Sequence, residues 1–227
     1  RVAWAVPNYS LQLLETDCHN EQWNLSDFGV PAAWGDGPGR HRVTVAVIDS
    51  GIDVDHPELS DAMLPGFNFH DMTTDPRPGT PGDSHGTHVT GIIAARGLQQ
   101  VTGVAGFPDT IRVVPIRIFN DTGTSAELDD LLQALAWAAG HDLRLPGVPV
   151  NRHPAQLVNL SLGAIGAPNP GVTDAIQAMV GSGITVVAAS GNVPSAGIHI
   201  PANSPAALAV GSVDSDFHRS SFSSFGG

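Results

Sequence analysis

Five stretches of the chain are apolar and rich in β-branched residues, and helical patterns separate several of them. Residues 41–49 are typical of a strand covered on both faces, because the apolar run is almost continuous and glycines bound it. The other stretches are residues 111–119, 157–162, 184–190 and 206–213. Pro115 interrupts the second of them, because proline cannot donate a hydrogen bond in the middle of a sheet.

Three segments between these runs have the spacing of amphipathic helices, at residues 84–95, 126–139 and 172–180. Ser84 occupies the N-cap position of the first, and Gly181 ends the third. Strands that alternate with helices are typical of a parallel sheet with crossover helices. The sequence therefore predicts an α/β fold with three layers, in which a mostly parallel central sheet is flanked by helices.

Two segments lack either periodicity and are predicted to be long loops. Residues 64–83 are rich in Pro, Gly and Asp, and residues 141–154 form the second loop. In open parallel sheets ligands bind at the carboxyl ends of the strands, so polar residues at those ends are the first candidates for a site.

Composition and charge exclude several classes of protein. The 227 residues suffice for one α/β domain, and a charged fraction of only 14% excludes a long fibrous or coiled-coil helix. The formal charge is −12 and lysine is absent, so the basic footprint of a nucleic-acid partner is missing, as are lysine chemistry and a P-loop. Cys18 stands alone and cannot form a disulfide within the chain. No apolar run predicts a membrane span.

Three polar residues fall where the predicted sheet would place a site. Asp49 ends the first strand, His85 opens the following helix, and Asn192 follows the fourth strand. A carboxylate that orients an imidazole, an imidazole that accepts a proton, and an amide that donates to an oxyanion together suggest acyl transfer. Each residue alone has an ordinary explanation as a turn former, a helix-start residue or a turn amide, so the hypothesis depends on their coincidence.

Five motifs in this order resemble those of the subtilases, the subtilisin-like serine peptidases, over residues 22–227. They are Val47-Ile-Asp-Ser-Gly-Ile-Asp53, His85-Gly-Thr-His-Val-Thr-Gly91, Val158-Asn-Leu-Ser-Leu-Gly163, Val187-Ala-Ala-Ser-Gly-Asn192 and Ser220-Ser-Phe-Ser-Ser-Phe-Gly226. The resemblance implies a subtilisin-like fold and a serine endopeptidase that hydrolyses peptide bonds through an Asp-His-Ser triad. It implies that Asp49 and His85 are catalytic and that Asn192 is the oxyanion donor.

The same resemblance assigns a substrate cleft. Its pocket walls are formed by two segments, and a third segment pairs with substrate as an added strand. The residues are Ser161, Leu162 and Gly163 on one wall, Ala188, Ala189 and Ser190 on the other, and Gly123 and Thr124 in the edge segment, residues 122–125. Spacing places His199 near the pocket floor. The walls carry no carboxylate, so uncharged or acidic P1 side chains are expected over Lys and Arg.

The nucleophilic serine of the family is missing from this pattern. In subtilases it lies in a Gly-Thr-Ser-Met-Ala type segment, beyond the Ser-Phe-Ser-Ser stretch. Gly123-Thr-Ser125 spells the tripeptide, but Ala-Glu-Leu follows and the position matches the substrate edge. Two interpretations stay open: a fragment or nicked form of an active enzyme, whose serine is on another segment or a second chain, or a catalytically inactive, peptide-binding relative. In either case residues 1–227 alone are expected to be inactive.

The beginning of the chain suggests an unprocessed form. Residues 2–9 resemble the last strand of a subtilase propeptide, and residues 22–34 resemble the start of a mature domain. We therefore expect a propeptide tail at residues 1–15 and a C-terminally incomplete peptidase domain at residues 16–227. The expected partners are a peptide or protein substrate and the protein's own propeptide, and the resemblance implies secretion.

Metal binding is less well defined by the sequence. We expect no catalytic cofactor, and structural calcium is implied only by the resemblance, without assignable ligands. The matching loop, residues 96–101, lacks Asn and Asp, and the alternatives are carboxylate clusters at residues 53–58 and 71–83, which solvated loops explain as well. His85 and His88 lack the context of a zinc motif, and the glycines at residues 163–166 and 181–183 lack that of a dinucleotide site.

Overall fold

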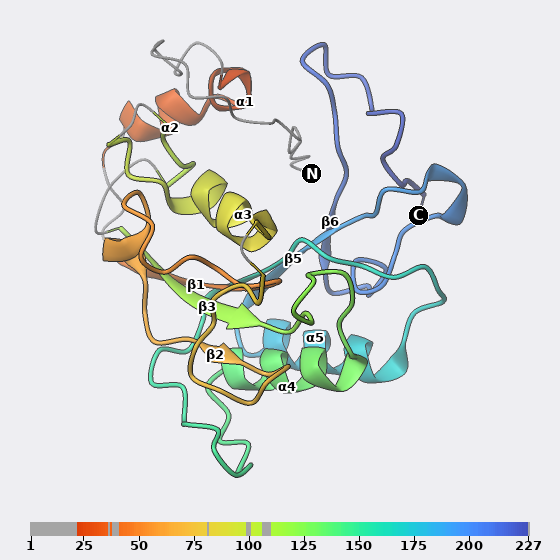
Figure 1. The fold of residues 1–227 in the computed structure, drawn as a ribbon. Coiled ribbons are helices and arrows are strands. Elements are labelled where there is room, and N and C mark those ends of the chain that lie inside the picture. The colour runs from red at the N-terminus through yellow and green to blue at the C-terminus, as the bar shows by residue number, and fades with distance from the viewer. Residues whose placement is uncertain are drawn as a thin grey trace.

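The central sheet of this protein is parallel throughout and has helices on both faces (Figure 1). The computed structural model describes residues 22–35, 37, 41–80, 82–98, 101–105 and 110–226. Six strands lie in the order β2-β3-β1-β4-β5-β6. They are β1 (Val43–Asp49), β2 (Phe67–Asn68), β3 (Ile111–Arg117), β4 (Leu157–Leu160), β5 (Thr185–Ala189) and β6 (Leu208–Val210). The predicted α/β architecture is confirmed.

The helices divide between the two faces of the sheet. Helices α4 and α5 cover one face, and α3 lies on the other (Figure 1). The bounds are α1 (Trp23–Asp27), α2 (Val30–Gly35), α3 (His85–Ala94), α4 (Leu128–Ala138) and α5 (Pro170–Gly181), with short 3₁₀ turns at Ser60–Ala62 and Pro194–Ala196. None of the helices in the described part of the chain is long and apolar enough to cross a bilayer.

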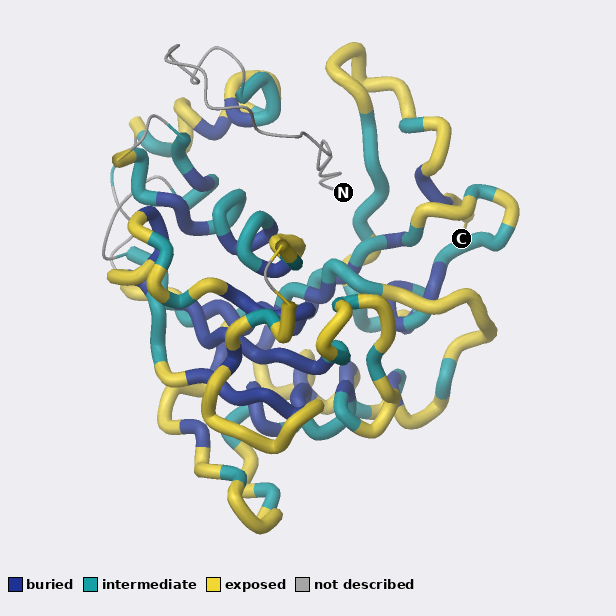
Figure 2. Tube along the Cα trace, viewed as in Figure 1, coloured by how far each residue is buried: buried dark blue, intermediate teal, exposed yellow. Residues whose placement is uncertain are grey.

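Strand β1 separates two hydrophobic cores because its side chains alternate between faces. Ala46 and Ile48 belong to the larger core beneath α4 and α5. Val45 and Val47 belong to the smaller core beneath α3. Asp49 continues the second series, so its side chain emerges on the α3 face at the end of the strand. Figure 2 shows the buried strands as the dark centre of the molecule.

One prediction about segments needs correction. The predicted loop at residues 64–83 contains a short edge strand, β2, which pairs with the end of β3. The predicted N-cap position of Ser84 is confirmed, although its side chain makes no capping bond. Asp83 Oδ1 instead accepts from the His85 amide, at 3.2 Å. The loop at residues 141–154 contains no helix or strand.

Pro115 lies inside β3 and is tolerated because of the direction of its missing amide. Phe69 N donates to Arg117 O at 2.8 Å, so odd-numbered residues of β3 direct their backbone groups toward the β2 side. At Pro115 that side is occupied by Gly66, where an added Cβ would lie 2.1 Å from the Pro115 oxygen. The backbone at Gly66 therefore packs tightly against Pro115 and needs no hydrogen bond from the nitrogen of this proline.

The predicted boundary near residue 15 falls outside the described residues, as does the whole predicted propeptide tail. The segment that resembles the start of a mature domain forms helices α1 and α2. Gln22 is tied to the body of the protein, because its side chain exchanges two hydrogen bonds with the backbone of Thr102, at 2.9 and 3.0 Å.

Candidate active site

Asp49 is a buried carboxylate at the carboxyl end of β1. Asp49 as a whole residue is 1% exposed. Oδ1 accepts from the Ser50 amide at 2.7 Å and lies 2.6 Å from Nδ1 of His85. Oδ2 is buried without a hydrogen-bond partner among the described residues. Because a buried carboxylate needs partners for its charge, the imidazole beside Oδ1 is an essential part of this arrangement.

His85 is the first residue of α3, which places its ring directly over the end of β1. The helix approaches the strand closely because the next residue is a glycine: an added Cβ at Gly86 would lie 2.3 Å from the Gly51 oxygen and 3.1 Å from the Asp49 side chain. One face of the ring meets solvent, since the His85 side chain is 58% exposed. The geometry therefore presents a carboxylate-oriented imidazole at the surface of the sheet edge.

The pair with Asp49 changes the protonation of His85. The hydrogen bond to the Asp49 carboxylate raises the pKa of His85, burial opposes this, and the charges of Asp49 and Asp83 reinforce it. His88, one turn along α3, has its pKa lowered, mainly by burial and also by the charge of His85. Two imidazoles on one helix thus have pKa values displaced in opposite directions, and only that of His85 is displaced toward the charged form.

Asp83 is a second carboxylate beside His85. Its Oδ1 accepts from the Ser50 hydroxyl at 3.0 Å, in addition to the His85 amide. It therefore links the residue after Asp49 to the first residue of α3. Oδ2 of Asp83 is buried without a hydrogen-bond partner in the described chain. An added Cβ at Gly123 would lie 2.5 Å from it, so the edge segment packs directly onto this carboxylate.

The two predicted pocket walls leave adjacent strands. Leu160 and Ala188 are register partners in β4 and β5, so the residues that follow each strand lie side by side. Ala188 is buried in the larger core, which leaves its backbone rather than its methyl group for a ligand. Ser190 is held in place, because its amide donates to Val210 O at 2.8 Å and its hydroxyl to Ser224 O at 3.0 Å.

His199 lies between these walls. An added Cβ at Gly191 would lie 2.4 Å from the His199 ring, and one at Gly163 would lie 3.2 Å from its Cβ. The residue is 7% exposed, and Nε2 is buried without a hydrogen-bond partner in the described part of the chain. The His199 amide donates to Ser190 O at 2.9 Å. The imidazole thus fills the space between Gly163, at the end of the first wall, and Gly191, which follows the second wall.

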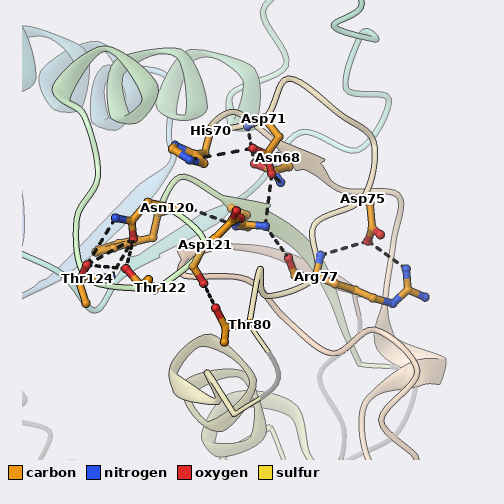
Figure 3. A network of polar contacts seen from close by, with 12 residues as sticks. Asn68, His70, Asp71, Asp75, Arg77, Thr80, Asn120, Asp121, Thr122 and Thr124 are labelled. Carbon is orange, nitrogen blue, oxygen red and sulfur yellow. Dashed lines mark hydrogen bonds and ion pairs between the residues drawn. The ribbon is translucent and has the colours of Figure 1, made fainter.

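The remaining predicted residues lie at the same edge of the sheet. Asn192 is exposed and follows β5, two strands from Asp49 in the sheet order. Gly123 and Thr124 belong to an exposed turn after β3 in which the Asn120 side chain bonds several neighbours (Figure 3). The structure places Asp49 and His85 in direct contact, whereas the other residues share this edge only because the carboxyl ends of parallel strands meet there.

Three residues near the catalytic pair were not predicted from the sequence. They are Ser50, Asp83 in its role of linking Ser50 to the His85 amide, and Arg117. Arg117 ends β3, is buried, and is the register partner of Asp49. A usable signal was present, because a charged residue directly after a buried apolar run needs a partner. The partners themselves were not predictable, because they lie in two loops, one at residues 71–80 and one after β3.

The acidic residues considered as calcium ligands have other partners. Arg77 pairs with Asp55 at 2.6 Å and with Asp75 at 2.9 Å. Glu58 Oε2 accepts from the amides of Arg96 and Leu98, both at 3.1 Å. Within the described residues no group of three or more His, Cys, Asp or Glu side chains is arranged to hold a metal ion. These carboxylates, engaged by arginine and by backbone amides, do not fit a calcium site as they stand.

Comparisons with known proteins agree with this architecture. The model of the subtilase family matches residues 40–227. An extracellular protease of Xanthomonas campestris pv. campestris is 34% identical over 91% of this chain and 40% of its own length. Subtilisin E of Bacillus subtilis is 33% identical over 90% of this chain and 49% of its length. The chain therefore spans less than half the length of these two relatives.

A solved structure of a protease from Pseudoalteromonas arctica shares the fold. It has a TM-score of 0.73 and 29% sequence identity, over 86% of this chain and 63% of that one. The family match covers most of the chain and includes Asp49, His85 and Asn192. On these grounds the chain belongs to the subtilase family, the subtilisin-like serine peptidases.

Proposed function

We propose that this chain provides the acid–base pair and the substrate cleft of a serine endopeptidase that cleaves peptide bonds. The observation that carries the proposal is the 2.6 Å contact between Nδ1 of His85 and the buried Asp49 carboxylate. A buried carboxylate fixes the tautomer of the imidazole and stabilises the imidazolium that forms when Nε2 accepts a proton.

His85 acts as the general base and then as the general acid. Nε2 takes the proton from a serine hydroxyl as the oxygen attacks the carbonyl carbon of the scissile bond, and it returns the proton to the leaving amine when the C–N bond breaks. A water molecule then repeats the sequence on the acyl-enzyme and releases the acid. Asn192 donates a hydrogen bond to the oxyanion in both halves.

The attacking serine is supplied by a segment outside residues 1–227. Gly123-Thr-Ser125 is the one Gly-Thr-Ser in the sequence, and its serine is held in the edge turn by the Asn120 side chain. Without the nucleophile, Asp49 and His85 cannot form an acyl-enzyme. Denaturing electrophoresis of the labelled protein distinguishes a serine in the same polypeptide from one in a second chain.

The substrate is a protein or peptide that binds in extended form against residues 122–125. The protein acts outside the cell, a proposal supported by the relative from Xanthomonas campestris, whose name is extracellular protease. Residues 1–15 are the end of a propeptide, and the protein's own propeptide is a further partner. Structural calcium, if this protein uses it, requires ligands other than the carboxylates described above.

A second function fits the same geometry. A subtilase scaffold without a nucleophile would bind peptides in this cleft and release them unchanged. The retained Asp49–His85 contact favours the enzyme, because a module that only binds has no need for an oriented base.

The test is fluorophosphonate labelling of the intact protein, followed by peptide mapping. The proposal expects one labelled serine outside residues 1–227, and loss of both labelling and casein hydrolysis in His85→Ala. Peptide binding with no labelling in the wild type would favour the binding module. A label on Ser125 would overturn the assignment of the nucleophile.

A further inference from the structure

We propose that Arg117 and Asp121 form a clamp that positions the substrate-binding edge, residues 122–125, relative to the catalytic pair. The inference rests on the proposed function, because it concerns how extended peptides are held. Arg117 and Asp121 do not touch substrate in this proposal. They are positioning residues that act through the turn between them and the edge segment.

The edge segment is organised internally by one side chain. Asn120 Oδ1 accepts from the Thr124 amide at 3.0 Å and from the Thr122 hydroxyl at 3.1 Å, and Nδ2 donates to the Ser125 hydroxyl at 2.9 Å. Figure 3 shows these contacts converging on Asn120. They give the turn its shape. They do not fix its place on the protein, because all the partners belong to the same turn.

The connection to the body of the protein runs through Asp121. Its Oδ1 accepts from Nη2 of Arg117 at 2.6 Å, and its backbone oxygen accepts from the Thr80 hydroxyl. Gly79 packs against it so closely that an added Cβ would lie 2.5 Å from the Asp121 Cα. Figure 3 shows Thr80 directed at the Asp121 backbone. Asp121 is thus the point at which the loop at residues 71–80, the end of β3 and the edge segment meet.

Arg117 is suited to anchor this point because its own position is fixed. Its side chain is 4% exposed. Nε donates to Phe119 O at 3.0 Å, Nη1 donates to Arg77 O at 3.2 Å, and the Asp71 carboxylate lies 3.5 Å away. A planar guanidinium with several donors can hold such a set, whereas a lysine ammonium cannot. The guanidinium therefore links the loop at residues 71–80 to the turn at Asp121.

The clamp and the catalytic pair are both attached to the ends of the neighbouring strands β1 and β3. Arg117 and Asp49 are register partners at the ends of β3 and β1, and Ile118 N donates to Asp49 O at 3.1 Å. The edge segment also packs on Asp83, which is hydrogen-bonded to the His85 amide. An extended peptide that pairs with residues 122–125 is consequently held at a set distance from His85.

The first test compares substrates of different length in the intact protein. The probes are acetyl-tetraalanine and acetyl-alanine p-nitroanilides. Asp121→Ala is the variant of choice, because the side chain is 70% exposed and its loss does not open the core. We expect KM for the long probe to rise about threefold to tenfold, the size expected when a binding segment must be ordered on association, with little change in kcat and with the short probe hardly affected.

The matched control is Asp75→Ala, which removes an exposed carboxylate that is paired with Arg77 in the loop at residues 71–80. This variant should leave the ratio of KM values for the long and short probes unchanged. Asp121→Asn keeps an acceptor oxygen and should restore part of the affinity. Equal losses on both probes, or none on either, would overturn the clamp.

The second test does not need catalysis. Amide hydrogen exchange of Thr124 and Ser125 in the intact protein should be faster in Asp121→Ala than in the wild type and unchanged in Asp75→Ala. Faster exchange without a change of length preference in an active enzyme would overturn the positioning role. A wild type that hydrolyses neither probe would contradict the proposed function, and the exchange rates would then still decide whether the clamp exists.

Discussion

Asp49 and Arg117 are register partners in neighbouring strands, and each presents its charged group at the same edge of the sheet. The carboxylate of Asp49 contacts the imidazole of His85, and the guanidinium of Arg117 contacts Asp121 in the turn that carries the proposed substrate edge. Both residues are buried, so each charge depends on its partners rather than on water. This register pair thus holds both the catalytic imidazole and the substrate-binding segment of the proposed enzyme in position.

The charge of Asp83 should tune the pH dependence of activity. Asn at this position keeps an oxygen that accepts from Ser50 and from the His85 amide but removes the negative charge, so the pKa of His85 should fall in Asp83→Asn. Because the neutral imidazole is the active form, the acidic limb of kcat/KM should move to lower pH. Asp49 also acts on this imidazole and is unchanged in the variant.

NMR titration of the His85 ring proton checks this directly, with Asp75→Asn as the control for an exposed carboxylate in a neighbouring loop. The sign for stability follows from the raised pKa: the contribution of the charged pair is complete below the ordinary histidine pKa and is lost as pH rises through the higher folded-state pKa. An unchanged His85 titration in Asp83→Asn would contradict the role assigned to Asp83.

Gly86→Ala should displace His85 and destabilise the protein. The added methyl group would lie 2.3 Å from the Gly51 oxygen, and overpacking of this kind costs about 1–3 kcal/mol. The control lies on the same helix: Gly91 has no atom within 4 Å of an added Cβ, so Gly91→Ala should stabilise by about 0.5–1 kcal/mol. Urea unfolding of both variants measures the difference, and equal midpoints would show that α3 does not pack on β1 as described.

His199→Ala should change the preference for the P1 side chain. The imidazole fills space between Gly163 and Gly191, and removing it enlarges the region between the predicted walls. We expect kcat/KM for P1 Phe relative to P1 Ala to increase by about tenfold or more, since one methylene in an apolar pocket is worth about 10- to 200-fold. His153→Ala, an exposed residue at the opposite end of β4, is the control. An unchanged ratio would exclude His199 from the pocket.

Glu58→Ala should loosen the loop after α3. Its carboxylate accepts from the amides of Arg96 and Leu98, and hydrogen bonds to a charged group contribute about 1.5–3 kcal/mol each. We expect the free energy of unfolding to fall by about 3–6 kcal/mol and the two amides to exchange faster. Glu127→Ala removes an exposed carboxylate and should cost far less. Comparable losses in the two variants would contradict a specific role for Glu58.

Much of this protein follows from local sequence patterns. The alternation of β-branched runs with amphipathic segments determined the α/β architecture, because the two periodicities are properties of neighbouring residues. Asp49, at the end of β1, and His85, at the start of α3, were candidates for the same reason: strand ends of a parallel sheet meet at one edge.

The tertiary structure decided the contacts between segments that are distant in the chain. Pro115 is accommodated because Gly66 lies against it, and β2 exists only as an edge partner of β3. The partners of Arg117 come from two loops, and the ring of His199 meets Gly163, which lies 36 positions earlier. Such contacts depend on how the chain closes over the sheet, and a local pattern of apolar and polar residues does not specify which distant groups then meet.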